Sequence, residues 1–149
     1  YIDLDNFKPF ADTFGFSIAD MVIRDMGQAI RGAIETAGTP TDFVGHIGGD
    51  DFIAVTSVQR AMSFARECAL QFIEVAKRAV GEEAVRRGHF TGVDREGRAR
   101  DFPITRLSAA VLQIGPDRWI STGHIGSLAA EVKRRAKQRG PGTILVQTV

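Results

Sequence analysis

The chain has 149 residues, of which 44% are hydrophobic and 25% are charged, and its formal net charge at pH 7 is +1. These values are typical of one globular domain with a substantial core, and the near-neutral charge gives no long-range attraction to nucleic acids or membranes. The single cysteine excludes an intrachain disulfide. No apolar run is long enough to cross a membrane and no signal peptide is visible, so we expect a cytoplasmic domain whose parent protein is either soluble or membrane-anchored.

Hydrophobic periodicity predicts the elements in chain order. Alternation in “YIDLD” predicts a strand, and Pro9 suits the first turn of a short helix. Helical spacing then predicts a helix that is capped by Ser17 and ends near Gly38. Two apolar runs, 42–47 and 52–57, flank “GGDD” and predict a hairpin.

The second half of the chain follows the same rules. The patterns predict a long helix over 62–80, a small hairpin around “DREG”, a strand over 104–114, a helix over 127–139 and a closing strand over 143–149. The resulting order is β-α-α-β-β-α-(hairpin)-β-α-β. It predicts the α+β class, with one mostly antiparallel central sheet flanked by helices.

Two aspartates in this layout can carry chemistry. Asp3 lies near the end of the first strand and Asp50 lies at the hairpin tip, so the two carboxylates converge if their strands are neighbours. Converging carboxylates repel each other unless a cation neutralises them. Mg²⁺ prefers one or two carboxylates together with phosphate oxygens and water, and the start of the short helix offers free N–H groups to phosphate. The pattern suits a metal–nucleotide site, and the alternative is a plain polar turn.

The two segments together narrow this choice. “DLDNFKPFADTFGFSIAD” followed by “HIGGDDFIAV” resembles the GGDEF domain of diguanylate cyclases, in a divergent GGDDF form. The resemblance covers essentially the whole chain, including “EVKRRAKQRG”. It implies that residues 1–149 are one GGDEF domain, excised from a larger multidomain signalling protein and lacking the usual N-terminal segment.

The resemblance also implies a fold and a reaction. The fold is a nucleotidyl-cyclase-like, ferredoxin-like palm. In the reaction, two GTP molecules are joined into cyclic di-GMP across a homodimer, with Mg²⁺ or Mn²⁺ as the metal. The implied partners are GTP and a flanking phosphodiesterase or sensor domain, with no nucleic acid and no membrane contact from this segment.

Individual residues acquire roles through the same resemblance. Asp3 and Asp50 match the metal-binding carboxylates, Leu4 adds its backbone carbonyl, and Asp50 also matches the catalytic residue that helps to activate the attacking hydroxyl. Asp5 is either a third metal ligand or a cap of the short helix. The remaining matched positions bind the nucleotide: phosphate through Phe7, Lys8 and Lys137, and guanine through Asp20 and Asp51.

Several positions depart from the family pattern. Ala11 replaces a guanine-binding asparagine, Phe16 a histidine, and Asp51 a glutamate that is one methylene longer. Pro141 replaces a phosphate-binding arginine, for which Arg139 is the only nearby substitute. The feedback site is degenerate and retains only Asp42, because Thr39 stands in place of its arginine.

These departures favour a degenerate GGDEF module of cyclic-di-GMP signalling. We expect a regulatory role that depends on binding GTP and Mg²⁺, with weak or absent cyclase activity and no product inhibition. Two alternatives stay open: an active diguanylate cyclase that tolerates the substitutions, and a dimerisation or scaffold module without a ligand.

Overall fold

The computed structural model describes residues 1–94 and 96–149 of the chain. Its elements follow the predicted order, with a small hairpin inserted after the third helix. They are β1 (Ile2–Leu4), α1 (Phe7–Phe14), α2 (Phe16–Ala37), β2 (Phe43–Gly48), β3 (Asp51–Val55), α3 (Ala61–Arg87), β4 (His89–Val93), β5 (Ala99–Pro103), β6 (Leu107–Gln113), α4 (Thr122–Arg139) and β7 (Ile144–Thr148).

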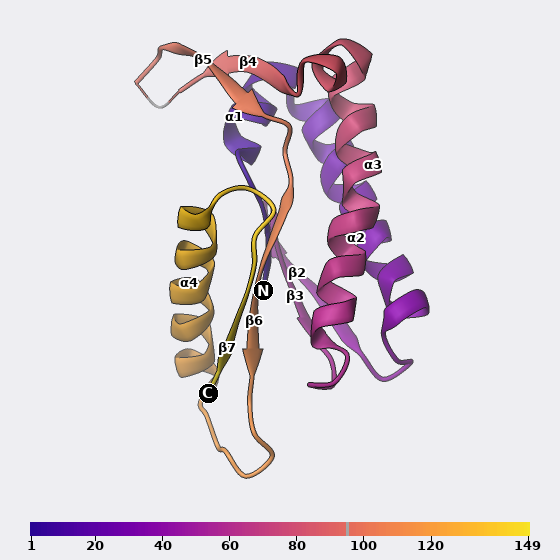
Figure 1. Cartoon of the computed structure of the whole chain (residues 1–149), viewed down its shortest axis with the longest axis vertical. Coiled ribbons are helices and arrows are strands. Elements are labelled where there is room, and N and C mark those ends of the chain that lie inside the picture. The colour runs from indigo at the N-terminus through magenta and orange to yellow at the C-terminus, as the bar shows by residue number, and fades with distance from the viewer. Residues whose placement is uncertain (95) are drawn as a thin grey trace.

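The central sheet has five strands in the order β2-β3-β1-β6-β7. Every neighbouring pair is antiparallel except β6 and β7, which are parallel. Helices α2 and α3 cover one face and α4 covers the other, while the separate β4–β5 hairpin lies beside α1 at one end (Figure 1). This confirms the predicted fold class, and it shows that the first strand is a neighbour of the GGDD hairpin, the condition on which the convergence of Asp3 and Asp50 depends.

Two helix boundaries differ from the predictions. Helix α2 begins at Phe16 after Gly15, whose φ is 88°, so the expected cap Ser17 lies inside the helix. Helix α3 runs to Arg87 because Gly81, with φ 82° and ψ 166°, kinks it without ending it. None of the helices among the described residues combines the length and apolarity that crossing a membrane requires.

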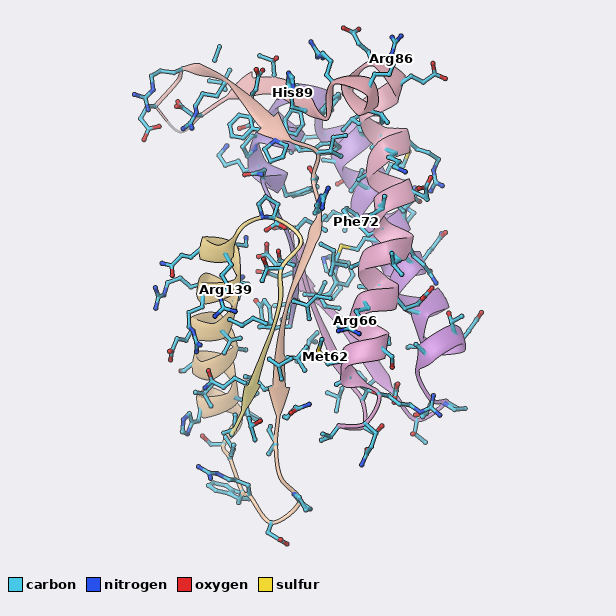
Figure 2. All side chains as sticks on the ribbon, viewed as in Figure 1. Met62, Arg66, Phe72, Arg86, His89 and Arg139 are labelled. Carbon is cyan, nitrogen blue, oxygen red and sulfur yellow. The ribbon has the colours of Figure 1, made fainter. Side chains whose placement is uncertain are left out.

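The two faces of the sheet carry cores of different size. The large core lies between the sheet and the α2–α3 pair and includes Phe72, which points inward from α3 (Figure 2). The small core lies under α4 and is made by Ala110, Val132, Ala136 and Leu145. Side chains alternate between faces along a strand, so neighbouring residues of β1 point to opposite faces of the sheet.

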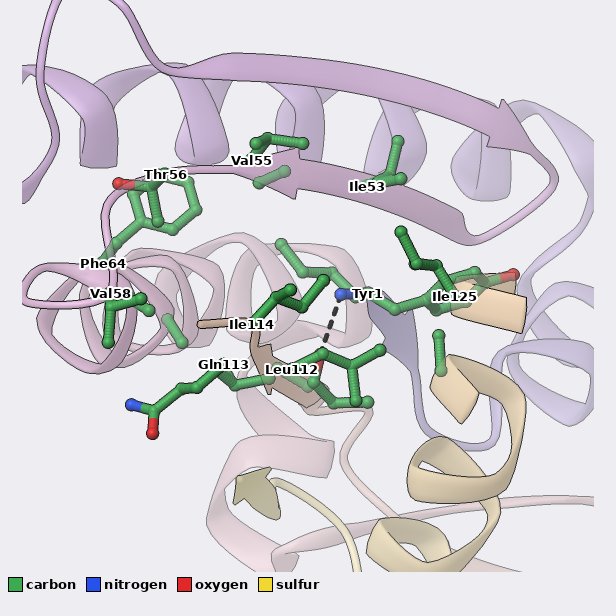
Figure 3. A pocket seen from close by; sticks show the side chains of 18 residues that line it. Tyr1, Ile53, Val55, Thr56, Val58, Phe64, Leu112, Gln113, Ile114 and Ile125 are labelled. Carbon is green, nitrogen blue, oxygen red and sulfur yellow. Dashed lines mark hydrogen bonds between the residues drawn. The ribbon is translucent and has the colours of Figure 1, made fainter. Parts of the chain in front are cut away.

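A hollow separates two strands at one end of the sheet. Strand β3 continues to Val55 and β6 continues to Gln113, beyond the point where β1 begins. An apolar cavity of about 320 Å³ lies between them, with Ile53, Leu112 and Ile125 among its lining (Figure 3). None of the residues predicted to bind metal or phosphate is among the residues that line this cavity.

Candidate functional site

The site begins with a buried carboxylate on β1. Ile2 and Leu4 point into the large core, so Asp3 between them points to the α4 face, where its side chain is 3% exposed. Ile2 pairs with Phe52 across the antiparallel strands β1 and β3. The same register sets Asp3 opposite Asp51, and like charges directly opposite each other on neighbouring strands are destabilising.

Two lysines on α4 neutralise this pair of carboxylates. The Nζ atom of Lys133 lies 3.0 Å from Oδ2 of Asp3 and 3.0 Å from Oδ1 of Asp51. Lys137, one helical turn further along, forms an ion pair with the other oxygen of Asp3. Lys133 also lies over the ring of Tyr1, 4.7 Å from its centroid. Helix α4 is therefore bound electrostatically to the acidic end of β1 and β3.

The ion pairs change the protonation equilibria of their members. Burial raises the pKa of Asp51, but the hydrogen bonds it shares with Lys133 and its other neighbours, together with the charge of Lys133, outweigh burial and hold that pKa below its ordinary value. Burial alone lowers the pKa of Lys133, and the hydrogen bonds to Asp51 and Asp3 raise it above its ordinary value. Lys133 is therefore a permanently charged cation between two carboxylates.

Asp50 lies in a different environment, at the tip of the β2–β3 hairpin. Gly49 has φ 57°, a left-handed conformation that favours glycine and turns the chain before Asp50. Burial raises the pKa of Asp50, and the charge of Asp3 raises it further. Asp3 and Asp50 line the same cavity beside the end of β1.

A cavity of about 770 Å³ opens beside these carboxylates. Its size is within the range of small-molecule pockets. Its lining joins Asp3, Leu4 and Asp50 to the start of α1 and the end of α4. The lining residues are Asp3, Leu4, Asp5, Asn6, Phe7, Lys8, Pro9, Asp12, Asp50, Val93, Asp94, Glu96, Arg100, Phe102, Lys137 and Pro141.

The start of α1 gives the cavity an electropositive wall. Asn6, which precedes the helix, has the left-handed φ of 56° and makes no side-chain capping bond. The first N–H groups of a helix have no partner within it and attract anions. Lys8 stands on the first turn, with an exposed side chain whose Nζ lies 2.7 Å from Oδ2 of Asp12. An exposed pair of this kind is weak, so Lys8 is readily available to another anion.

Asp5 serves the framework of this cavity. Its Oδ2 accepts a hydrogen bond from Oγ of Ser108 at 2.7 Å and one from the backbone N–H of Gly142 at 2.8 Å. Burial raises the pKa of Asp5, and these hydrogen bonds oppose that rise. The capping role considered for Asp5 is wrong, since Asn6 is the residue that precedes α1 and has no capping bond.

Other predicted nucleotide-binding positions lie away from this cavity. Asp20 is exposed on α2, and Asp51 is engaged by Lys133; neither lines the cavity. Arg139, the candidate substitute for Pro141, lies in the last turn of α4 (Figure 2) and is not among the lining residues. The proposed contacts of Asp20 and Asp51 with a base stay predictions.

The degenerate feedback site has an internal structure of its own. Asp42 accepts hydrogen bonds from the backbone N–H and hydroxyl of Thr39 and from the hydroxyl of Thr56. Partial desolvation raises the pKa of Asp42, but these hydrogen bonds outweigh it and hold the pKa below its ordinary value. Asp42 thus ties β3 to the loop before β2.

The donors around Asp3 fit a small divalent cation only in part. Within residues 1–94 and 96–149, no three His, Cys, Asp or Glu side chains are grouped to hold a metal ion. In the same residues, Oδ1 of Asp3 is buried without a hydrogen bond, and the ammonium of Lys137 is its ionic partner. Such an oxygen suits a cation, and Mg²⁺ needs only one or two carboxylates when phosphates and water complete its shell.

Sequence reasoning missed two features of this site. The sequence pattern gives no role to Lys133, although it stands four residues before Lys137 and so shares its side of α4. The β4–β5 hairpin was recognised as an element, but its part in the cavity was not. It supplies one wall through Asp94 and Arg100 among others, and no motif in the sequence marks that role.

Known proteins resemble the chain at two levels. Residues 1–90 match the family described as “Diguanylate cyclase, GGDEF domain”. A segment of 54 residues is 37% identical to the diguanylate cyclase DgcS of Shewanella oneidensis. The segment makes up 36% of this chain and 17% of that protein. The chain thus matches less than one fifth of the length of this curated relative.

Solved structures extend the likeness to nearly the whole chain. The active GGEEF domain of a diguanylate cyclase from Vibrio cholerae matches 97% of this chain and 78% of its own, with a TM-score of 0.57 and 19% identity. The GGDEF domain of TpbB (YfiN) from Pseudomonas aeruginosa matches 97% and 73%, with a TM-score of 0.56 and 18% identity. At these identities the likeness shows the fold alone.

Proposed function

Because this chain belongs to the GGDEF domain family of diguanylate cyclases, the domains of cyclic-di-GMP signalling, we propose that it is a regulatory module that binds a nucleoside triphosphate with Mg²⁺ and turns it over weakly or not at all. The observation that carries the proposal is the lining of the 770 Å³ cavity. Asp3, Asp50, Lys8 and Lys137 meet there, while Pro141 stands at the position where a further phosphate ligand is expected.

The cavity offers separate groups to a triphosphate. The N-terminus of α1 and Lys8 bind phosphate oxygens from one side, and Lys137 binds them from the other. Charge-assisted hydrogen bonds of this kind are about twice as strong as neutral ones. Pro141 has no side-chain donor, so the cavity holds the triphosphate with fewer contacts than an arginine at that position would allow.

Diguanylate cyclases of this family use a divalent metal. When bound, Mg²⁺ would neutralise phosphate charge, with Asp3, Asp50 and the carbonyl of Leu4 as its protein ligands. In this chain, Asp50 is the residue proposed to accept a proton from an attacking hydroxyl.

Selection of guanine is the weakest part of the proposed function. Ala11 has no polar side chain, and the carboxylate of Asp51 is already held by Lys133. Loss of one polar contact to a base costs roughly 1–3 kcal/mol. We therefore propose that residues 1–149 form one nucleotide-binding GGDEF domain of a larger signalling protein, and that the role of this domain is regulatory.

The alternative of an active diguanylate cyclase keeps one specific observation in its favour. Asp3 and Asp50 both line the cavity, and such chemistry requires a pair of carboxylates of this kind. Activity would also need two domains facing each other as a homodimer, with one GTP bound to each.

One experiment separates these functions. GTP binding in the presence of Mg²⁺ is measured by calorimetry, and cyclic-di-GMP formation by chromatography, on the domain within its parent protein. We expect GTP binding with little product, and Lys77→Met on α3 serves as a control that leaves binding unchanged. Turnover that Asp50→Ala abolishes would establish the cyclase instead, whereas no binding at about millimolar GTP (roughly −4 kcal/mol) would leave the scaffold module.

A further inference from the structure

The position of Lys133 is the least expected feature of the acidic site. Its ammonium lies at equal distances of 3.0 Å from Asp3 and Asp51, which face each other across β1 and β3. Its side chain is 23% exposed, whereas that of Lys137 is 41% exposed. Lys133 is thus the more deeply held of the two cations, and it bridges two strands that would otherwise oppose like charges.

We propose that Lys133 is a tethered cation that occupies the buried carboxylate of Asp3 and must be displaced before a divalent metal binds there. This rests on the proposed function only in taking Asp3 as the metal-binding carboxylate. Lys133 would then set the affinity of the domain for metal, and it would keep the acidic site neutral and folded when no metal is present.

Competition follows from the geometry at Asp3. Both of its oxygens are ion-paired, Oδ2 with Lys133 and Oδ1 with Lys137. Each ammonium group takes one approach to the carboxylate and repels a divalent ion that binds the same group, so both lysines lower the affinity of Asp3 for a metal. The apparent affinity for metal is therefore the affinity of free Asp3 multiplied by the fraction of molecules in which Asp3 is free.

The two lysines differ in how easily they leave. Lys137 has a single carboxylate partner and lines the open cavity, so an incoming phosphate offers it an alternative. Lys133 does not line that cavity, and Asp51 and the ring of Tyr1 hold it from two further sides. Displacing Lys133 from Asp3 needs no loss of its contact with Asp51, so we expect it to withdraw toward Asp51 when metal binds.

The test measures metal binding without nucleotide, using Mn²⁺ and electron paramagnetic resonance of the free ion on the domain within its parent protein. Lys133→Met removes the charge and keeps an unbranched side chain that is one atom shorter, and Lys133→Gln retains a hydrogen-bond donor toward Asp51. We expect either variant to bind Mn²⁺ about tenfold more tightly than the unchanged protein, which corresponds to Asp3 being free in roughly a tenth of molecules. Lys133→Arg keeps the charge and should leave the affinity within about twofold.

A second measurement guards against loss of folding. Without metal, Lys133→Met leaves Asp51 without its cation and Asp3 with Lys137 alone, so the thermal midpoint of the variant should fall and then rise on addition of Mn²⁺. The midpoint of the unchanged protein should respond much less. Lys77→Met, on the far side of the large core, is the matched control and should change neither Mn²⁺ affinity nor its effect on the midpoint.

Three results would overturn the proposal: no gain in Mn²⁺ affinity in either neutral variant, an equal gain in Lys133→Arg, or an equal gain in Lys77→Met. The proposed function fails separately. It fails when the unchanged protein binds no GTP, whatever the metal titrations give, and the competition at Asp3 fails when the metal titrations are flat while GTP still binds.

Discussion

The hydroxyl of Ser108 on β6 donates a 2.7 Å hydrogen bond to Oδ2 of Asp5, in the buried junction where the chain leaves β1 and turns into α1. The same oxygen accepts the N–H of Gly142, just after α4. One carboxylate thus joins three segments that surround the cavity, and its contribution is structural.

Asp5→Ala should therefore lower the free energy of unfolding. The change leaves the Ser108 hydroxyl and the Gly142 N–H without their acceptor in a buried place, which costs about 2–3 kcal/mol. Asp5→Asn should cost less, because it keeps a carbonyl acceptor and because burial already raises the pKa of Asp5. Urea denaturation measures both, with the exposed Asp117→Ala as control. Equal stability of Asp5→Ala and the control would refute the structural role.

The raised pKa of Asp50 predicts a pH-dependent stability. A carboxyl whose pKa is higher in the folded state than in the unfolded state destabilises the fold when ionised, and the penalty disappears as the pH falls below the unfolded pKa. Asp50→Asn removes this penalty and should therefore raise the thermal midpoint at pH 7. The difference should vanish near pH 4, about the ordinary pKa of the group. A difference that grows toward low pH would contradict the assigned cause.

The two cavity lysines should each strengthen nucleotide binding. Lys8→Met and Lys137→Met remove one charged phosphate contact each, and we expect the affinity for GTP with Mg²⁺ to fall about tenfold in either case. The double variant should fall further. Calorimetry measures all three beside Lys77→Met, and unchanged affinity in both single variants would place the triphosphate elsewhere.

Restoring the missing contacts should increase affinity and guanine preference. Ala11→Asn with Pro141→Arg adds one base contact and one phosphate contact, and we expect GTP to bind about tenfold more tightly, with a smaller gain for ATP. Adding Asp51→Glu gives a triple variant that tests the fourth signature position. If the affinity for GTP does not move in either variant, these positions do not contact the nucleotide.

The lone cysteine is a probe of global unfolding. Cys68 is completely buried on α3, and burial raises the pKa of its thiol to about 12. Since only the thiolate reacts with alkylating reagents or disulfide reagents, the folded protein should remain unlabelled at pH 8. Labelling should appear at the rate of unfolding, and rapid reaction of the native protein would show that α3 opens locally.

The sequence determined more of the fold than of the site. The element order was predicted correctly because each amphipathic stretch has one period, as the stripe around Cys68 on α3 illustrates. The extension of α3 past Gly81 was missed because the predicted apolar stripe ends at Val80 and the residues after Gly81 are mostly polar. Register and distance then decide the site, and neither can be read from spacing alone.

Asp51 and Lys133 show this limit most clearly. Alternation along β3 places Asp51 on the face opposite Phe52, which points into the large core. The different environments of the side chains of Asp51 and Asp50 were therefore open to prediction. The partner of Asp51 was not open to prediction, because Lys133 reaches Asp51 only after α4 has packed against β6 and β7. A long-range ion pair between a helix and a hairpin tip leaves no periodic signal in the sequence.

Helix α4 has a modest attachment to the rest of the domain. Its packing face contributes Val132 and Ala136 to the small core, which is separate from the large core shared by α2 and α3. Stability is not uniform in such a structure, and an element that buries little apolar area opens more readily than one in a large core. The amide hydrogens of α4 should therefore exchange with solvent through a partial opening that leaves α2 and α3 protected. Since α4 carries both lysines of the acidic site, occupation of that site should change how often this helix opens.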